Sequence, residues 1–246
     1  MRSSASATLV AVRIATWNLE RGGRTRAARE AQEETLSALH ADVVILTEPP
    51  ATYRKGPGVV TSPALRSGTG GPESWVAIVG PSVEALPYDV PYNRLAVAAR
   101  VALGGRSTIV YGAVLPWLSV RSHVPDLVQH GEEYGDVFAR VLDAQRADLL
   151  KLRANGDPVV WAGDFNQSVA GPNHGGSKSG RDALNGCLAD LGMVAWNGAA
   201  AHAREGLHAI DLICGSRDQA ILGQGRIDPR RGGVQMSDHA GYWVDL

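Results

Sequence analysis

The sequence DVVILTE, residues 42–48, is a nearly continuous apolar run that ends in an acidic residue, and Pro49-Pro50 follows it. Such a run is typical of a β-strand that is covered on both faces. A second apolar run, residues 159–163, ends in Asp164-Phe165-Asn166. Buried strands that lie far apart in the chain and alternate with amphipathic segments predict an α/β fold.

Working outward from these two strands, apolar alternation predicts further strands, and 3.6-residue periodicity predicts helices. Glycines at 104 and 105 indicate a hairpin between two of the strands. The expected strands are residues 9–17, 75–79, 94–101, 108–115, 206–214 and 239–244. The expected helices are residues 26–39, 131–153 and 181–190, and the expected loops are residues 54–73, 116–130 and 168–182.

The composition is that of an ordinary globular protein. The chain has 246 residues, 44% of them hydrophobic and 20% charged, with a net charge of −1. This balance excludes a disordered tail protein. Proteins that hold nucleic acid by bulk electrostatics usually carry a strong basic excess. Any phosphate contact is therefore expected to be local, through a few arginines or a metal ion.

The chain shows no segment that points to export or to a membrane. No apolar run reaches 18 residues, so we expect no membrane span. The N-terminal apolar run is too short for the core of a signal peptide. Cys187 and Cys214 do not make a disulfide framework and are expected to be small buried side chains. No linker divides the chain, so we expect one domain over residues 1–246, monomeric and cytoplasmic.

Polar side chains stand at the ends of several predicted strands or between apolar residues. Buried carboxylates are costly unless something neutralises them, and a hard divalent cation does so with oxygen ligands. The chain lacks cysteine ligands and closely spaced histidine pairs, which disfavours zinc and leaves Mg²⁺ or Mn²⁺. The candidate residues are Asn18, Glu20, Glu48, Asp164, Asn166, Asp211, Asp238 and His239.

Two of these groups suit the hydrolysis of a phosphoester. Asp164 with Asn166 can take a proton from water and hold the water in line with phosphorus. The imidazole of His239 can hydrogen-bond a developing phosphorane oxygen, provided that a carboxylate such as Asp211 keeps it protonated and oriented.

The same residues form motifs that resemble, in order, those of the endonuclease/exonuclease/phosphatase superfamily. The resemblance covers the chain from about residue 10 to the end. The five motifs are Thr16-Trp17-Asn18-Leu19-Glu20, Leu46-Thr47-Glu48, Gly163-Asp164-Phe165-Asn166, Ile210-Asp211-Leu212-Ile213 and Ser237-Asp238-His239.

The resemblance implies a four-layer α/β sandwich, in which two mixed β-sheets pack face to face with helices outside. It also implies Mg²⁺- or Mn²⁺-dependent cleavage of a phosphoester by direct attack of water. Carried over by motif, Glu48 is the principal metal ligand, and Asn18 and Glu20 are metal or phosphate contacts. Asp238 is a carboxylate on the metal side.

The remaining motif residues carry the chemistry. Asp164 activates water, Asn166 orients the water or the phosphate, and Asp211 is the partner of His239, which stabilises the transition state. Arg94 corresponds loosely to a phosphate-binding arginine of some family nucleases.

The chain departs from the family pattern in its middle. Many members have a Tyr or His where Val114 stands here, and Tyr111 is three residues away, which puts it on the opposite face of the strand. The leaving-group contact is then missing, or is supplied by His123 or by a metal-bound water. Ala209 stands where relatives often have Arg, and Pro49-Pro50 follow Glu48. These differences argue against the contacts that family nucleases make with the DNA backbone.

Three hypotheses follow for the function. The first is a metal-dependent phosphodiesterase or nuclease that acts on a phosphoester substrate, with nucleic acid as one candidate. The second is a phosphomonoesterase or small-molecule phosphodiesterase on the same scaffold. The third is a catalytically silent binding module, which the presence of Glu48, Asp164 and His239 argues against.

Overall fold

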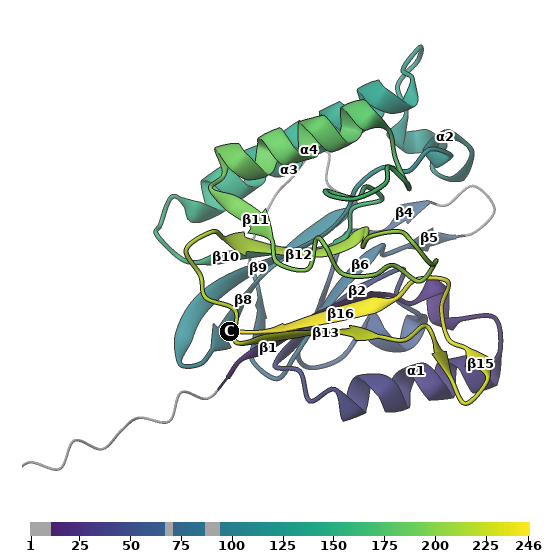
Figure 1. Cartoon of the computed structure of the whole chain (residues 1–246), viewed down its shortest axis with the longest axis vertical. Helices are drawn as coiled ribbons and strands as arrows, with labels where there is room; N and C mark the ends of the chain where they lie inside the picture. Colours follow the sequence, from purple (N-terminus) through teal and green to yellow (C-terminus); the bar gives the residue numbers. More distant parts are fainter. Residues whose placement is uncertain (1–10, 67–70, 87–93) are drawn as a thin grey trace, which may run out of the picture.

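The computed structural model describes residues 11–66, 71–86 and 94–246, and in it two six-stranded mixed sheets lie face to face with helices on both outer sides (Figure 1). The four-layer α/β sandwich predicted above is therefore confirmed. The part of the first predicted strand at Leu9 and Val10 lies outside the described residues.

The first sheet has the strand order β13-β16-β1-β2-β6-β3, and only β1 and β2 run parallel. Its strands are β1 (Arg13–Asn18), β2 (Val43–Thr47), β3 (Val59–Thr61), β6 (Val76–Val79), β13 (Gly223–Ile227) and β16 (Gly241–Asp245).

The second sheet has the order β11-β12-β10-β9-β8-β7, and only β9 and β10 run parallel. Its strands are β7 (Val83–Ala85), β8 (Ala96–Leu103), β9 (Arg106–Val114), β10 (Val159–Asp164), β11 (Met193–Ala195) and β12 (Asp211–Ser216). Two short hairpins lie outside the sheets and consist of β4 (Leu65–Arg66), β5 (Pro72–Glu73), β14 (Arg230–Arg231) and β15 (Val234–Gln235).

The helices cover the outer faces of the two sheets. Helices α3 and α4 lie over the second sheet, and α1 lies over the first (Figure 1). The helices are α1 (Arg26–Ala38), α2 (Val120–His123), α3 (Tyr134–Arg153) and α4 (Lys178–Asp190), with 3-10 turns η1 (Glu20–Gly22), η2 (Ala51–Tyr53) and η3 (Pro125–Leu127).

Local sequence signals explain where the helices begin. Thr25 accepts a hydrogen bond from Ala28 N and caps α1, and Ser177 caps α4 in the same way. Glu133 and Asp136 form a capping box at the start of α3. The predicted helix 131–153 therefore begins three residues late, at Tyr134, and the predicted helix 181–190 begins three residues early, at Lys178.

Short strands account for the main differences from the sequence prediction. The predicted loop 54–73 contains β3 and the β4–β5 hairpin, and the predicted strand 206–214 begins only at Asp211. The predicted loops 116–130 and 168–182 contain α2, η3 and the start of α4. Strands β7, β11 and β13 were not predicted. The first two have only three residues each, and β13 (GQGRI) has no apolar alternation, so all three depend on pairing with a neighbouring strand.

The main core fills the space between the two sheets. In β1, Ile14 is buried in this core, while Ala15 and Trp17 belong to a second cluster with Leu39 at the end of α1. A Cβ added at Gly112 of β9 would lie 2.8 Å from Val76 of the facing sheet, which shows how closely the two sheets approach. This packing fixes the strand ends that carry the polar residues.

Gly163 is expected to be essential for stability. Residues other than glycine rarely adopt its φ of +140°, and a Cβ there would lie 1.9 Å from the carbonyl oxygen of Ala113 in β9. We expect Gly163→Ala to lower the free energy of unfolding by roughly 3 kcal/mol or more in urea denaturation. The matched control is Gly135→Ala, since Gly135 lies in α3 with open space around it. Its effect should stay within about 1 kcal/mol; equal losses for both variants would contradict the argument.

Candidate active site

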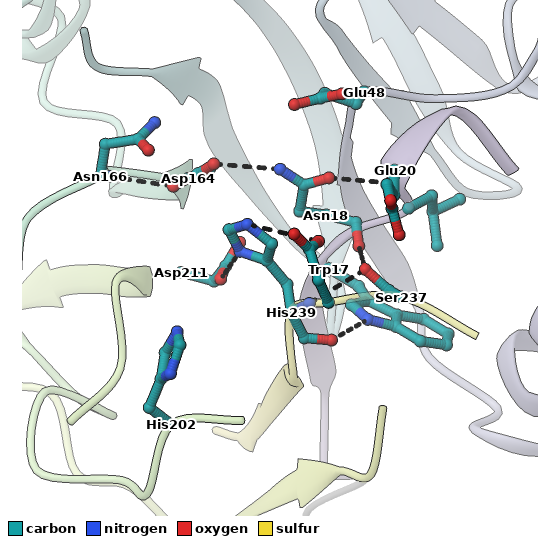
Figure 2. Close-up of polar contacts among 12 residues, drawn as sticks. Trp17, Asn18, Glu20, Glu48, Asp164, Asn166, His202, Asp211, Ser237 and His239 are labelled. Atoms are coloured by element: carbon teal, nitrogen blue, oxygen red, sulfur yellow. Dashed lines mark hydrogen bonds and ion pairs between the residues drawn. The ribbon is translucent and has the colours of Figure 1, made fainter. Parts of the chain in front are cut away.

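Six of the predicted residues meet at one end of the two facing sheets (Figure 2). Asn18 ends β1, and its neighbour in the parallel register with β2 is Thr47, the residue before Glu48. Asp164 ends β10 and lies opposite Asp211 in the antiparallel register with β12. The residues brought together are Asn18, Glu48, Asp164, Asn166, Asp211 and His239.

His239 is held in place from two sides. Its Nδ1 lies 2.7 Å from Oδ2 of Asp211, whose side chain is fully buried. Its backbone N–H donates to Ser237 Oγ at 3.1 Å, and that hydroxyl donates to the carbonyl oxygen of Asn18 at 2.7 Å. The imidazole is thus fixed relative to the end of β1, and its Nε2 faces the exposed carboxylate of Asp238 at 3.8 Å.

Electrostatics keep this imidazole charged. Burial opposes the imidazolium, but the carboxylates of Asp211 and Asp164 outweigh it and raise the pKa of His239 well above its ordinary value. Burial raises the pKa of Asp211, and His239 acts in the opposite direction. The arrangement therefore favours a protonated His239 at neutral pH, which makes both ring nitrogens donors.

Asp164 lies between the two asparagines. Its Oδ2 accepts a hydrogen bond from Asn18 Nδ2 at 3.0 Å, and its Oδ1 accepts one from the backbone N–H of Asn166 at 2.9 Å. Burial, with a further contribution from Asp211, raises the pKa of Asp164 to about 7. A carboxyl group with this pKa can exchange a proton near neutral pH, as a general base requires.

Backbone strain is concentrated at the same place. Non-glycine residues rarely adopt positive φ, and four of those that do so in the described chain lie here. Their φ values are +47° for Glu20, +58° for Arg21, +45° for Glu48 and +49° for Asn166. Asn166 is further held because its Nδ2 donates to the carbonyl oxygen of Leu115 at 3.0 Å.

Glu48 has an arginine partner that the sequence analysis missed. The Nε of Arg21 lies 3.5 Å from Glu48 Oε2, and the backbone N–H of Arg21 donates to the carbonyl oxygen of Glu48 at 2.9 Å. Arg21 is also ion-paired with Glu73. Burial raises the pKa of Glu48, Arg21 opposes this, and Asp164 adds to it. The only signal in the sequence was the position of Arg21 directly after the first motif.

Three predicted residues lie at the margin of this group or apart from it. The carboxylate of Glu20 pairs with Arg24 at 3.1 Å, although its backbone N–H donates to Asn18 Oδ1. Asp238 has a side chain that is 62% exposed, and its Oδ1 lies 3.8 Å from His239 Nε2. Glu20 and Asp238 line one groove together with Arg24.

Arg94 is exposed and precedes β8. Within the described part of the chain, no hydrogen bond or ion pair joins Arg94 to the site residues. The structure therefore gives no support to the predicted phosphate contact, which stays a prediction.

In the middle of the chain, the structure places the residues at which the sequence departs from the family pattern. The hydroxyl of Tyr111 donates to Asp148 of α3 at 2.9 Å, so this ring lies on the helix-covered face of the sheet, as its spacing predicted. Val114 is buried. His123 is exposed on α2, and its Nδ1 lies 2.9 Å from the carbonyl oxygen of Ser119.

Two further histidines lie beside His239 and were also missed as a group. The ring centroid of His202 lies 6.4 Å from that of His239 and 4.4 Å from that of His174. Burial and His174 lower the pKa of His202 to about 4, so this imidazole is neutral. The residues come from loops that only the fold brings together, and no local sequence pattern links them.

The donor set fits a hard divalent cation. Asp164, Asp211 and His239 each offer one ligand atom within 4.8 Å of the others, but Asp211 and His239 are already hydrogen-bonded to each other. Glu48 and Asp164 both have raised pKa values through burial and repel each other electrostatically. A divalent cation between oxygen donors removes this repulsion, and carboxylates with an amide oxygen suit Mg²⁺ or Mn²⁺.

A comparison with protein families finds a match to the Endonuclease/Exonuclease/phosphatase family over residues 15–239. The chain belongs to this family. The match covers all six residues that the structure brings together, from Asn18 to His239. Endonucleases, exonucleases and phosphatases all hydrolyse phosphoesters, so membership of the family indicates an enzyme of that kind. No curated protein matches the chain.

Solved structures of the same fold include an AP endonuclease from Archaeoglobus fulgidus, with a TM-score of 0.64 and 17% identity over 95% of this chain and 98% of that one. A 3'-5' exonuclease from Neisseria meningitidis has a TM-score of 0.64 and 18% identity over the same shares. A 3' phosphatase from Neisseria bound to a product DNA hairpin has a TM-score of 0.62 and 18% identity, again over 95% and 98%. These likenesses show the fold. No helix in the described ranges is both long and apolar enough to cross a membrane.

Proposed function

We propose that this member of the Endonuclease/Exonuclease/phosphatase family is a phosphodiesterase or nuclease that depends on Mg²⁺ or Mn²⁺ and uses direct attack of water. One observation carries the proposal: a buried Asp164 with a pKa near 7 lies in one group with a His239 that Asp211 holds charged. A base and a cationic donor are the two protein groups that an in-line attack on phosphorus requires.

Glu48 and Asn18 are the residues that would hold the cation, next to Asp164, whose carboxylate is kept as the base. When bound, a divalent cation supplies charge stabilisation to a phosphoryl oxygen and lowers the pKa of water. The backbone N–H of Glu20 donates to Asn18 Oδ1, and the carboxylate of Asp238 lies 3.8 Å from His239 Nε2. We propose that both residues contribute at the margin of the metal site.

The protein's own groups divide the chemistry. Asp164 takes the proton from the attacking water, because burial raises the pKa of its carboxyl group to about 7. The hydrogen bonds from Asn18 and Asn166 hold the carboxylate in position. Asn166 presents its amide next to Asp164 and orients the water or the phosphate. His239 donates Nε2–H to the phosphoryl oxygen on which negative charge grows, and Asp211 holds the ring in that orientation.

We also infer that residues 1–246 act as one domain. The first described strand, β1, pairs with the last strand, β16, and neither is an edge strand of the first sheet. The second sheet is built from residues between them, and the site takes residues from both sheets. Division of the chain at any point between Asn18 and His239 would separate groups that the site needs.

The test is hydrolysis of a panel of substrates with Mg²⁺, Mn²⁺ or a chelator, and with Asp164→Ala as the inactive variant. The panel contains abasic duplex DNA, single-stranded DNA, a chromogenic phosphodiester and phosphomonoesters. We expect metal-dependent turnover of diesters that the chelator and Asp164→Ala both abolish. Turnover of monoesters alone would support the phosphatase alternative. No turnover and no cation binding would support a silent binding module and overturn the proposal.

A further inference from the structure

A row of aromatic side chains leads away from the site on the side of Glu48. We name it the aromatic strip and define it as Trp75, Trp117 and His123. The ring centroids of Trp75 and Trp117 are 5.1 Å apart, and those of Trp117 and His123 are 6.0 Å apart. At the inner end, the guanidinium carbon of Arg21 lies 4.8 Å from the Trp75 ring centroid.

Backbone hydrogen bonds tie the strip to two residues of the site. The N–H of Glu48 donates to the carbonyl oxygen of Trp75 at 2.9 Å. Asn166 donates to the carbonyl oxygen of Leu115, and Trp117 is two residues further along the chain. Two Cα–Cα steps span at most about 8 Å. Trp117 therefore lies within reach of a group attached to a phosphate held at Asn166.

The strip is only partly covered. Trp75 is buried, at 4% exposure, whereas Trp117 is half-buried and His123 is exposed. Leu118, next to Trp117, is 61% exposed. A tryptophan that served packing alone would gain most from complete burial. Trp117 instead packs against the core, has Trp75 and His123 as ring neighbours, and keeps part of its surface exposed.

The chemistry of the strip selects a flat aromatic ligand. The charge of the chain is −1, and its only lysines are Lys55, Lys151 and Lys178. Arg21, at the inner end of the strip, is engaged by Glu48 and Glu73. The strip thus offers π-surface rather than cations, and loss of one aromatic–base stack typically weakens binding between about 5-fold and 150-fold.

We propose that Trp117, supported by Trp75, stacks on the nucleobase of an unpaired nucleotide next to the scissile phosphate. The substrate class is then single-stranded nucleic acid, because a paired base has its faces covered by its neighbours. The inference rests on the proposed function, since it names the substrate of the same site. It also explains how a chain with almost no net charge retains a nucleic acid: stacking adds affinity that salt does not screen.

The test compares two substrates on matched variants. The substrates are a dithymidine phosphodiester and the same sugar–phosphate backbone with both bases replaced by hydrogen, each with Mn²⁺. Trp117→Ala should raise KM for dithymidine by about 10-fold to 100-fold and change KM for the baseless diester less than 2-fold. Trp117→Phe should retain most of the affinity, and Leu118→Ala, at the neighbouring exposed position, should resemble the wild type.

Equal losses of Trp117→Ala on both substrates would show a structural role and overturn the proposal, as would a wild type that does not distinguish them. A second measurement does not depend on hydrolysis. Thymidine monophosphate should quench tryptophan fluorescence of the Asp164→Asn protein, and Trp117→Leu on that background should lose the quenching. If no diester is hydrolysed but the quenching is present, the proposed function fails and the stacking site stands; absent quenching removes the stacking site.

Discussion

His239→Gln lowers kcat for the best phosphodiester by about 10²-fold to 10³-fold in our expectation, with little change in KM. The loss of one preorganised donor to a developing oxyanion typically has this size. Gln retains a hydrogen-bond donor but not the positive charge that Asp211 and Asp164 maintain on the imidazole. The charge acts mainly on the transition state, so the loss should fall on kcat. Steady-state kinetics at saturating Mn²⁺ measure it.

The partner and a control make the result specific. Asp211→Asn should lower kcat as well, and the double variant should be no worse than about the larger single effect, because the two residues act as a unit. His130→Gln is the matched control, since His130 is an exposed histidine on a loop. If the double variant shows the product of the two single losses, the residues act independently and the paired mechanism is wrong.

Much of the site was predictable because its residues stand at the ends of apolar strands. Asn18 and Asp164 are the last residues of β1 and β10, and Glu48 directly follows β2. Each is marked locally by an apolar run that ends in a polar residue. The ends of the parallel strands β1 and β2 meet at one edge of the first sheet, which explains why Asn18 and Glu48 converge. The approach of Asp164 depends on how the second sheet faces the first, which the family resemblance implied and the local pattern did not.

The residues that the sequence could not place are those whose partners are set by distant parts of the fold. Arg21 pairs with Glu48 and Glu73, which are 27 and 52 residues further along the chain. Glu20 stays a predicted metal or phosphate contact, and in the structure its carboxylate pairs with Arg24, four residues along the chain. Side-chain direction at a strained φ cannot be read from residue type, and Glu20 and Arg21 both have positive φ.

Loop residues were the hardest to interpret. The loop predicted over residues 54–73 forms β3 and a hairpin that places Glu73 beside Arg21 and Arg54. Trp75 precedes β6 of the first sheet and Trp117 follows β9 of the second, and only their packing reveals a continuous aromatic row. The proposed stacking site therefore depends on contacts between segments that have no common sequence pattern.

Asp164→Asn is expected to lower kcat/KM by about 10²-fold to 10⁴-fold, the range typical of a lost general base. The reaction needs the ionised carboxylate, and burial raises its pKa to about 7. Wild-type kcat/KM should therefore rise about tenfold per pH unit below neutral pH and level off above it. A bound cation favours the ionised carboxylate of Asp164 and shifts this rise of kcat/KM, the acid limb of the pH profile, to lower pH. The Asp164→Asn variant should lack the acid limb.

Stability separates this role from a structural one. A carboxyl whose folded pKa is raised stabilises the fold when protonated, and that contribution is lost as pH rises from about 4 to about 7. In chelator at pH 8, Asp164→Asn should therefore unfold at the same or higher urea concentration than the wild type, since the amide removes a buried charge. The control is Asp190→Asn, an exposed residue at the end of α4. An acid limb that persists in Asp164→Asn would assign the base to another residue.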